Sequence, residues 1–363
     1  MAIPLTDVRA QYAPLLDEVK QRIAEVLDSG RFILGPEVKA FEEEAARFIG
    51  AEDAVGVANG TDALVLVLDA LGVGPGDEVV CPSFTFYATA ESIARRGAEP
   101  VFADIDPATL NLNAADVAAK VTERTKAILP VHLFGRPAGL AALPDSAPLV
   151  EDAAQAFGAR VGDRRAGSVG AAATFSFYPT KNLFGLGDGG LVTTGTGELA
   201  ERIRLLRFHG SRDKQTFEAV GYNSRLDELQ AAALRIFLRH VDEWNESRRA
   251  AAARYGELGL SEVCELPADE PGHVYHMYVV RTRERERLTA ALDQAGIGWA
   301  AYYTTPLHLQ PALAELGYAG GSLPETERAA RETLALPIWP AISLEQQERV
   351  VECLRAASTE KAA

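Results

Sequence analysis

One lysine lies between an apolar segment and a glycine-rich segment. Residues 175–178 read Phe-Ser-Phe-Tyr, Lys181 follows them, and residues 185–190 read Gly-Leu-Gly-Asp-Gly-Gly. An ammonium group near apolar and aromatic side chains is penalised by desolvation, which lowers its pKa and makes the neutral amine available for a Schiff base. The stretch therefore indicates a catalytic lysine, although a solvated lysine at the end of a strand fits it equally well.

The glycine-rich segment 185–190 also matches the G-x-G-x-x-G spacing of a dinucleotide-binding turn. That turn follows a strand and opens a helix, whereas here residues 191–194, Leu-Val-Thr-Thr, predict a second strand. A nicotinamide-dependent sugar oxidoreductase is thus an alternative that depends on spacing alone. We expect these glycines to allow a sharp turn or a close backbone approach.

Gly60 and Thr61 follow the apolar segment 54–58 and precede a predicted helix over 63–71. The start of a helix offers free backbone N–H groups and the positive end of a dipole, so a phosphate could bind there. A threonine at this position also serves as a plain helix cap, and the sequence leaves both interpretations open.

Two further candidates follow predicted strands. Asp152 comes after the strand 148–150 and would either cap a helix or hold a heterocyclic ring nitrogen in its protonated form. Its neighbour Glu151 should point the opposite way along an extended chain, which disfavours a pair of hydrolytic carboxylates. Phe86 is either a core residue or a ring that stacks on a planar cofactor.

Strands and helices alternate along the first half of the chain, which predicts βαβ units and a largely parallel sheet with helices on both faces. Ligands of such sheets bind beyond the carboxyl ends of the strands, where these candidates fall. A long helical segment, 226–258, is expected to bridge two domains, 1–245 and 246–363. The other predicted strands are 78–81, 100–103, 127–131 and 277–280, and the other predicted helices are 12–27, 37–48, 86–95, 110–121, 195–207, 285–295, 325–334 and 345–356.

Composition excludes several classes of protein. The 363 residues carry a formal net charge of -15, which argues against nonspecific binding to nucleic acid or to an anionic membrane surface. Three dispersed cysteines and the unsuitable spacing of His273 and His276 predict no metal site, so we expect the two histidines to be structural or to face the substrate. Neither a signal peptide nor a membrane span is apparent, so the expected location is the cytoplasm.

Seven segments together resemble the DegT-type nucleotide-sugar aminotransferases, which depend on pyridoxal 5'-phosphate (PLP) and have fold type I. The resemblance implies an α/β fold, with a large domain containing a mixed, mostly parallel sheet and a smaller C-terminal α/β domain. The segments are 59–64 (NGTDAL), 82–86 (PSFTF), 97–102 (GAEPVF), 150–155 (VEDAAQ), 175–181 (FSFYPTK), 221–232 (GYNSRLDELQAA) and 306–311 (PLHLQP).

The resemblance also implies roles for named residues. Lys181 would hold the cofactor as a Schiff base and move the proton at the substrate carbon, and Asp152 would pair with the ring nitrogen. The remaining implied cofactor contacts are Gln155 at the ring hydroxyl, Phe86 on the ring face, and Gly60, Thr61 and Ser176 at the phosphate. Asn223 would reach the phosphate from a neighbouring subunit, which implies a homodimer with shared active sites. Tyr303, His308 and Arg225 are the expected substrate contacts.

The implied reaction is a two-step transamination. L-glutamate would convert the cofactor to its pyridoxamine form, and a nucleotide-linked keto sugar would then accept the amine. The turn after Lys181 resembles that of members acting on 3-keto sugars, in a pathway such as polysaccharide biosynthesis. A 4-keto sugar substrate and a non-catalytic regulator that keeps the fold are the alternatives.

Overall fold

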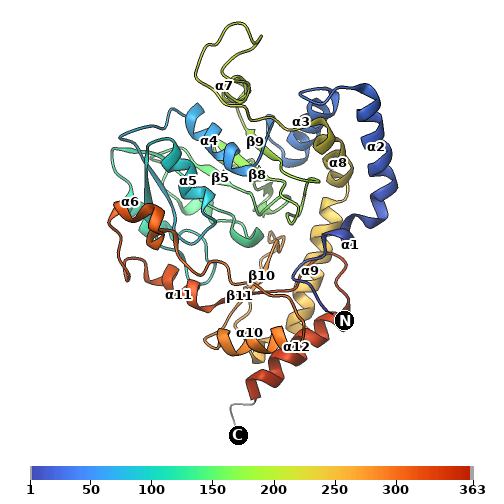
Figure 1. Cartoon of the computed structure of the whole chain (residues 1–363). Coiled ribbons are helices and arrows are strands. Elements are labelled where there is room, and N and C mark those ends of the chain that lie inside the picture. Colours follow the sequence, from blue (N-terminus) through green and yellow to red (C-terminus); the bar gives the residue numbers. More distant parts are fainter. Residues whose placement is uncertain (1, 360–363) are drawn as a thin grey trace.

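The computed structural model describes residues 2–359, and its centre is a sheet formed from two strand groups (Figure 1). One group has the order β1, β9, β8, β5 and the other the order β3, β2, β4. Parallel bridges from Ile128 to Leu149 and from Val131 to Asp152 join the two groups. The strands are β1 (Asp53–Val57), β2 (Glu78–Pro82), β3 (Glu99–Ala103), β4 (Thr125–Ile128), β5 (Val150–Asp152), β8 (Ala172–Ser176) and β9 (Gly190–Thr194).

The sheet is mixed. β2 runs parallel to β3 and β4, and β5 runs parallel to β8. β9 is antiparallel to both of its neighbours, β1 and β8. The glycine-rich segment 185–190 therefore leads into a strand and not into a helix, as the sequence predicts, and its spacing does not make a dinucleotide-binding turn.

Helices cover both faces of the sheet, and successive strand residues alternate between two hydrophobic cores. Val55 and Val192 pack with α4, α5 and α7 in one core, whereas Ala54 and Leu191 pack with α3 and α8 in the other. Burial on both faces explains why the strands are apolar throughout. These helices are α3 (Pro36–Ile49), α4 (Gly60–Ala70), α5 (Ala88–Arg95), α7 (Gly197–Arg207) and α8 (Glu228–Leu238).

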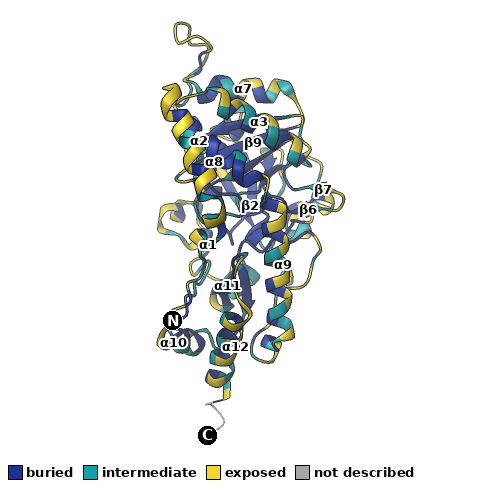
Figure 2. Ribbon diagram, turned by 90° about the vertical axis from the view of Figure 1, so that its right-hand side faces the viewer, coloured by how far each residue is buried: buried dark blue, intermediate teal, exposed yellow. Residues whose placement is uncertain are grey.

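The outer elements complete this part of the chain. α2 (Leu16–Ser29) packs on α8 and exposes its outer face, which is visible in Figure 2. The remaining helices and strands are α1 (Val8–Tyr12), α6 (Ala114–Lys120), β6 (Arg160–Val161) and β7 (Arg164–Arg165). Short 3-10 segments cover Ala13–Leu15, Leu133–Gly135, Leu140–Ala142, Leu260–Glu262, Leu307–Leu309 and Pro311–Leu316.

A third core lies in the C-terminal part, around Tyr255, Tyr278 and Leu354. Ile3 also belongs to this core and forms a parallel bridge with Ile297, so an N-terminal segment packs with C-terminal residues. The proposed division at 245/246 stays a prediction. The elements here are α9 (Val241–Glu257), β10 (Tyr278–Arg281), α10 (Arg285–Gln294), α11 (Pro324–Glu332), β11 (Thr333–Leu336) and α12 (Leu344–Thr359).

Three sequence-predicted elements illustrate where prediction and structure differ; the ends of the others are shifted by up to four residues, as for 12–27, whose α-helix α2 begins at Leu16. The segment 226–258 is not one helix but two, α8 and α9, and its apolar period persists through the break because Phe237 and Val241 both face the same core. The helix expected over 110–121 begins only at Ala114, since Leu110 has φ 61° and Asn113 caps the later start. The helix expected over 325–334 ends at Glu332, where β11 begins and pairs with β10.

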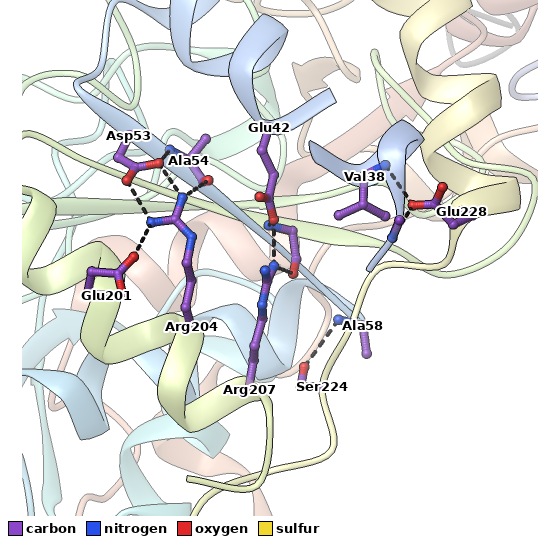
Figure 3. Close-up of polar contacts among 12 residues, drawn as sticks. Val38, Glu42, Asp53, Ala54, Ala58, Glu201, Arg204, Arg207, Ser224 and Glu228 are labelled. Atoms are coloured by element: carbon purple, nitrogen blue, oxygen red, sulfur yellow. Dashed lines mark hydrogen bonds and ion pairs between the residues drawn. The ribbon is translucent and has the colours of Figure 1, made fainter. Parts of the chain in front are cut away.

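A buried ion pair between Arg207 and Glu42 fixes β1 against the helices around it (Figure 3). Arg207 on α7 donates to Glu42 of α3 at 2.5 Å and to the carbonyl of Gly56 at 2.6 Å, while Glu42 accepts the Gly56 N–H at 2.7 Å. Both side chains are at most a tenth exposed. Because β1 leads directly into the start of α4, this network positions the first wall of the site described next. None of the described helices is long and apolar enough to cross a membrane.

Candidate active site

A cavity of about 690 Å³ opens at the carboxyl ends of the central strands. Eight of the eleven sequence-predicted site residues line it. Each comes from a strand end, from the first turn of a helix or from a loop beside the sheet, as expected for an α/β protein. The eight are Gly60, Thr61, Phe86, Asp152, Gln155, Ser176, Lys181 and Tyr303.

Asp152 ends β5 and is only 5% exposed. One carboxylate oxygen accepts the Thr89 hydroxyl at 2.9 Å and the other accepts the Ala154 N–H at 3.2 Å. Burial raises the pKa of Asp152, and these hydrogen bonds together with the charge of Lys181 partly oppose that increase. The buried carboxylate therefore favours a cationic or N–H-bearing group in the cavity.

Lys181 follows β8 in the tight turn that begins at Tyr178, whose carbonyl accepts the Lys181 N–H at 2.9 Å. Burial lowers the pKa of Lys181 to about 8, against the opposing attraction of Asp152. A substantial fraction of this amine is neutral near physiological pH, unlike an ordinary lysine. It can therefore attack a carbonyl carbon or accept a proton.

The carboxylates of Glu151 and Asp152 point to opposite sides of β5, as predicted. Glu151 is fully buried behind the strand, where it accepts hydrogen bonds from His132 at 2.9 Å and from the backbone N–H groups of Gly167, Val169 and Gly170. Burial raises the pKa of Glu151, but these hydrogen bonds and the His132 ring outweigh it, so the net shift is downward. Glu151 therefore supports the loop behind the site and does not face the cavity.

Gln155 and Tyr303 form one end of the cavity. The Gln155 amide donates to the Tyr303 hydroxyl at 3.0 Å and its carbonyl accepts the Phe134 N–H at 2.7 Å. The Tyr303 ring stacks on Phe134 and lies 6.4 Å from the ring of Phe86. Phe86 is 58% exposed in the single chain, so its ring is free to cover a planar ligand.

The start of α4 forms the other end. Asn59 caps this helix by accepting the Asp62 N–H at 2.8 Å, so the cap is Asn59 and neither Thr61 nor Asp62. A Cβ atom at Gly60 would lie 2.8 Å from the Cβ of Ser176, so only glycine allows β8 to approach so closely. Thr61 and Ser176 add hydroxyls beside the free N–H groups of the first turn, which is a suitable set for a phosphate.

Three predicted site residues do not line this cavity. Asn223 is exposed, and Arg225 lies with its guanidinium 5.8 Å from the ring of Phe208. His308 is 2% exposed, with Nδ1 2.7 Å from the Ser83 hydroxyl and Nε2 3.3 Å from Glu327. These contacts indicate that His308 holds the loop carrying Tyr303 against the end of β2. Contact of His308 or Arg225 with substrate stays a prediction.

Sequence reasoning missed Thr89, which donates to Asp152. Thr89 lies in the first turn of α5, three positions after Phe86, whose carbonyl accepts its N–H at 3.2 Å, and this spacing could have placed it on the same side as Phe86. Tyr178, Thr180, His276 and Tyr302 also line the cavity. His276 comes from a segment without regular structure, where no periodicity predicts the direction of a side chain. Within residues 2–359 no group of three or more His, Cys, Asp or Glu side chains could hold a metal ion.

A family model, related sequences and a solved structure all place the chain in the same protein family. The model of the "DegT/DnrJ/EryC1/StrS aminotransferase family" matches residues 15–355. The chain is 48% identical to a "Pleiotropic regulatory protein" of Geobacillus stearothermophilus, with 97% of each chain covered. It is 46% identical to a "dTDP-3-amino-3,4,6-trideoxy-alpha-D-glucose transaminase" of Streptomyces venezuelae, with 97% of this chain and 95% of that protein covered. A crystal structure of S. venezuelae DesV in complex with a ketimine intermediate superposes with a TM-score of 0.96 at 46% identity, covering 99% of both chains.

The cofactor of this family is PLP, and the cavity suits it. The buried carboxylate of Asp152 faces the space that a pyridinium nitrogen requires, and the amine of Lys181 has the lowered pKa that Schiff-base formation requires. The start of α4, with Ser176 against it, has the N–H and hydroxyl groups that would hold the phosphate. The chain belongs to the DegT/DnrJ/EryC1/StrS aminotransferase family and is a PLP-dependent aminotransferase.

Proposed function

We propose that this aminotransferase transfers an amino group from L-glutamate to a nucleotide-linked 3-keto sugar. The observation that carries the proposal is the arrangement of Lys181 and Asp152 in one cavity of about 690 Å³, open enough for a cofactor and a substrate together. The sugar and the 3-position are supported by the 46% identity to a transaminase named for a dTDP-3-amino sugar.

Each residue of the site has a distinct task in this proposal. PLP, when bound, supplies an electron sink for the carbanion that forms at the substrate carbon. Lys181 accepts and returns the proton at that carbon, because its lowered pKa leaves a fraction of the amine neutral. Asp152 holds the ring N–H, and Thr89 fixes the orientation of that carboxylate. Gly60, Thr61 and Ser176 would hold the phosphate, and Gln155 would contact the ring hydroxyl.

We further infer a homodimer in which Asn223 completes the partner's phosphate site. Asn223 is exposed, and Phe86 and Tyr178 at the cavity are 58% and 55% exposed in the single chain. Phe217 and Val220 are also exposed, on a segment after α7 that projects from the rest of the chain (Figure 1). Exposed aromatic side chains at the cavity and exposed apolar side chains on the projecting segment support a protein partner. The cytoplasmic location stays a prediction.

Two other functions are weighed against this one. A 4-keto sugar would use the same cofactor chemistry and differ only in which carbon lies at Lys181. A regulatory role is favoured by the name of the Geobacillus stearothermophilus relative, "Pleiotropic regulatory protein". The lowered pKa of Lys181 beside Asp152 favours catalysis, because a purely regulatory protein has no use for a reactive amine.

Separate half-reactions test the proposal. L-glutamate should convert the PLP form to the pyridoxamine form, with the corresponding change in the visible spectrum and release of 2-oxoglutarate. A panel of UDP- and dTDP-linked 3-keto and 4-keto sugars should then restore the original spectrum only with 3-keto members. Restoration by 4-keto sugars alone would reassign the position, and no spectral change with L-glutamate would support the regulatory alternative.

A further inference from the structure

A side pocket of about 220 Å³ adjoins the active-site cavity. Tyr178, Thr180, His276 and Tyr302 line both spaces, whereas Lys181 lines only the larger one. A substrate group that enters the side pocket is therefore separated by several bonds from the carbon that reacts at Lys181. Hydroxyls of Thr6, Thr180 and the two tyrosines give the pocket hydrogen-bond donors.

His276 is the buried polar group of this side pocket. It is 4% exposed, and its Nδ1 atom has no hydrogen-bond partner among the described residues. The backbone holds its segment firmly, because Val274 N–H donates to Gly135 at 3.0 Å and the Val274 carbonyl accepts the Asn182 amide at 2.9 Å. The ring thus has no hydrogen bond within residues 2–359, which is unfavourable for a buried imidazole, and because Nδ1 is enclosed a ligand in the side pocket would pair with Nε2.

Arg248 places a positive charge behind the same wall. It is 1% exposed and has no carboxylate partner within residues 2–359. Its hydrogen bonds go to neutral acceptors, the carbonyls of Tyr275 at 3.4 Å and Ile338 at 3.3 Å and the side chain of Gln11 at 3.4 Å, and its Nε atom has none. Burial lowers the pKa of Arg248 only to about 10, so the guanidinium stays charged at neutral pH.

The electrostatic potential at His276 is accordingly positive. Burial lowers the pKa of His276 well below its ordinary value, and the charges of Lys181 and Arg248 lower it further. The ring is neutral and can donate one N–H without bringing a charge of its own. A buried cation without a counter-ion is costly, and an anionic ligand group beside it relieves that cost.

We propose that the side pocket binds the side-chain carboxylate of a dicarboxylic amino donor. The inference rests on the proposed function and deepens it. His276 donates a hydrogen bond to that carboxylate, and Arg248 stabilises it through its charge from behind the wall. Arg248 is a positioning residue in this arrangement, because it does not itself line the pocket. The site thus separates glutamate from donors of the same shape that are neutral at that end.

The test compares L-glutamate with L-glutamine, which has the same shape and a neutral amide in place of the carboxylate. We expect the unaltered holoenzyme to prefer L-glutamate in the first half-reaction, and His276→Phe and Arg248→Met to reduce the ratio of kcat/KM values about 10-fold. Arg248→Lys should recover part of the preference because it keeps the charge. Arg249→Met is the matched control: Arg249 is the next residue on α9, is partly exposed and pairs with Glu246, so the ratio should not change.

Glutarate provides a readout that does not require turnover. Its affinity for the PLP form, measured by calorimetry, should fall about 10-fold in His276→Phe and stay unchanged in Arg249→Met. Pentanoate, which has one carboxylate, should bind the unaltered enzyme more weakly than glutarate. If Arg248→Met does not fold, the glutarate affinity and the donor preference of His276→Phe alone test the side-pocket assignment.

Equal use of L-glutamate and L-glutamine by the unaltered enzyme, or glutarate binding that His276→Phe leaves intact, would overturn the inference. Measuring the keto-sugar half-reaction of the same preparations distinguishes failure of the side-pocket assignment from failure of the proposed function. Retention of that half-reaction leaves the proposed function standing while the side-pocket assignment fails. If the unaltered enzyme catalyses neither half-reaction, the proposed function itself is refuted.

Discussion

The hydroxyl of Thr89 donates to the carboxylate of Asp152 across 2.9 Å in the interior of the site. This hydrogen bond stabilises the charged form of a carboxylate whose pKa burial raises. Thr89→Val should therefore raise the pKa of Asp152 further and reduce turnover by about 3- to 10-fold, on the order of one hydrogen bond to a charged group. Thr89→Ser should retain most of the activity. Equal kcat values for the valine and serine variants would show that the hydroxyl is not used.

Lys181→Ala removes the amine on which the reaction depends. We expect the visible absorbance of the lysine-bound cofactor to disappear and turnover to fall by at least about 1,000-fold. Lys126→Ala is a suitable control, because this exposed lysine lies far along the chain on β4. An unchanged absorption spectrum in Lys181→Ala would contradict the assignment.

The lowered pKa of Lys181 predicts how the stability of the cofactor-free protein depends on pH. The folded value is about 8 and the ordinary value is 10.5, so between these values the unfolded chain binds more protons than the folded one. The Lys181 contribution to stability therefore rises with pH across this window, and the destabilisation is fully present below about 8. Urea unfolding of the unaltered protein and of Lys181→Met from pH 7 to 10.5 measures it. The stability advantage of Lys181→Met should shrink as the pH rises, and a constant difference would contradict the prediction.

Glu228 supports a helix far away in the sequence. Its buried carboxylate accepts the N–H groups of Gly35, Glu37 and Val38 at 2.8 to 2.9 Å, at the start of α3 (Figure 3 shows the Val38 contact). Glu228→Gln should lower the free energy of unfolding by about 2 kcal/mol, because an amide has one acceptor oxygen and a hydrogen-bond donor that meets N–H groups. Glu43→Gln on the exposed side of α3 should change it by less than about 0.5 kcal/mol. Both measurements need the same protein concentration, since a dimer gains stability with concentration.

Shared active sites predict complementation between two inactive chains. Lys181→Ala lacks the amine, and Asn223→Asp brings a negative charge to the partner's phosphate site. Unfolding and refolding the two variants together should produce hybrid dimers with one intact site, giving about a quarter of the unaltered activity for random pairing. Activity no greater than the mean of the separate variants would contradict the shared site.

The parts of the site that follow regular elements could be predicted from the sequence. Lys181, Asp152 and Gly60 lie at ends of strands or starts of helices, and an α/β sheet brings such ends together whatever the details of packing. The opposite directions of Glu151 and Asp152 likewise follow from the period of a strand.

Other features depend on contacts between distant segments. His276 faces the cavity because backbone hydrogen bonds hold its irregular segment against Gly135 and Phe134, and no local pattern signals this. β11 pairs with β10, which lies far from it in the sequence. This pairing ends helix α11 at Glu332, whereas the local helical pattern predicts a helix through residue 334. The break between α8 and α9 is hidden for a related reason: both helices bury the same apolar face.

Ile3 has a consequence for how the chain is assembled. Its N–H donates to Gly296 at 3.0 Å and its carbonyl accepts the Gly298 N–H at 2.7 Å, inside the C-terminal core. On the ribosome, this segment emerges long before its partners are synthesised, so it must wait unpaired while most of the polypeptide is translated. The C-terminal core therefore closes only after residues 296–298 have been made, around a segment that was synthesised much earlier.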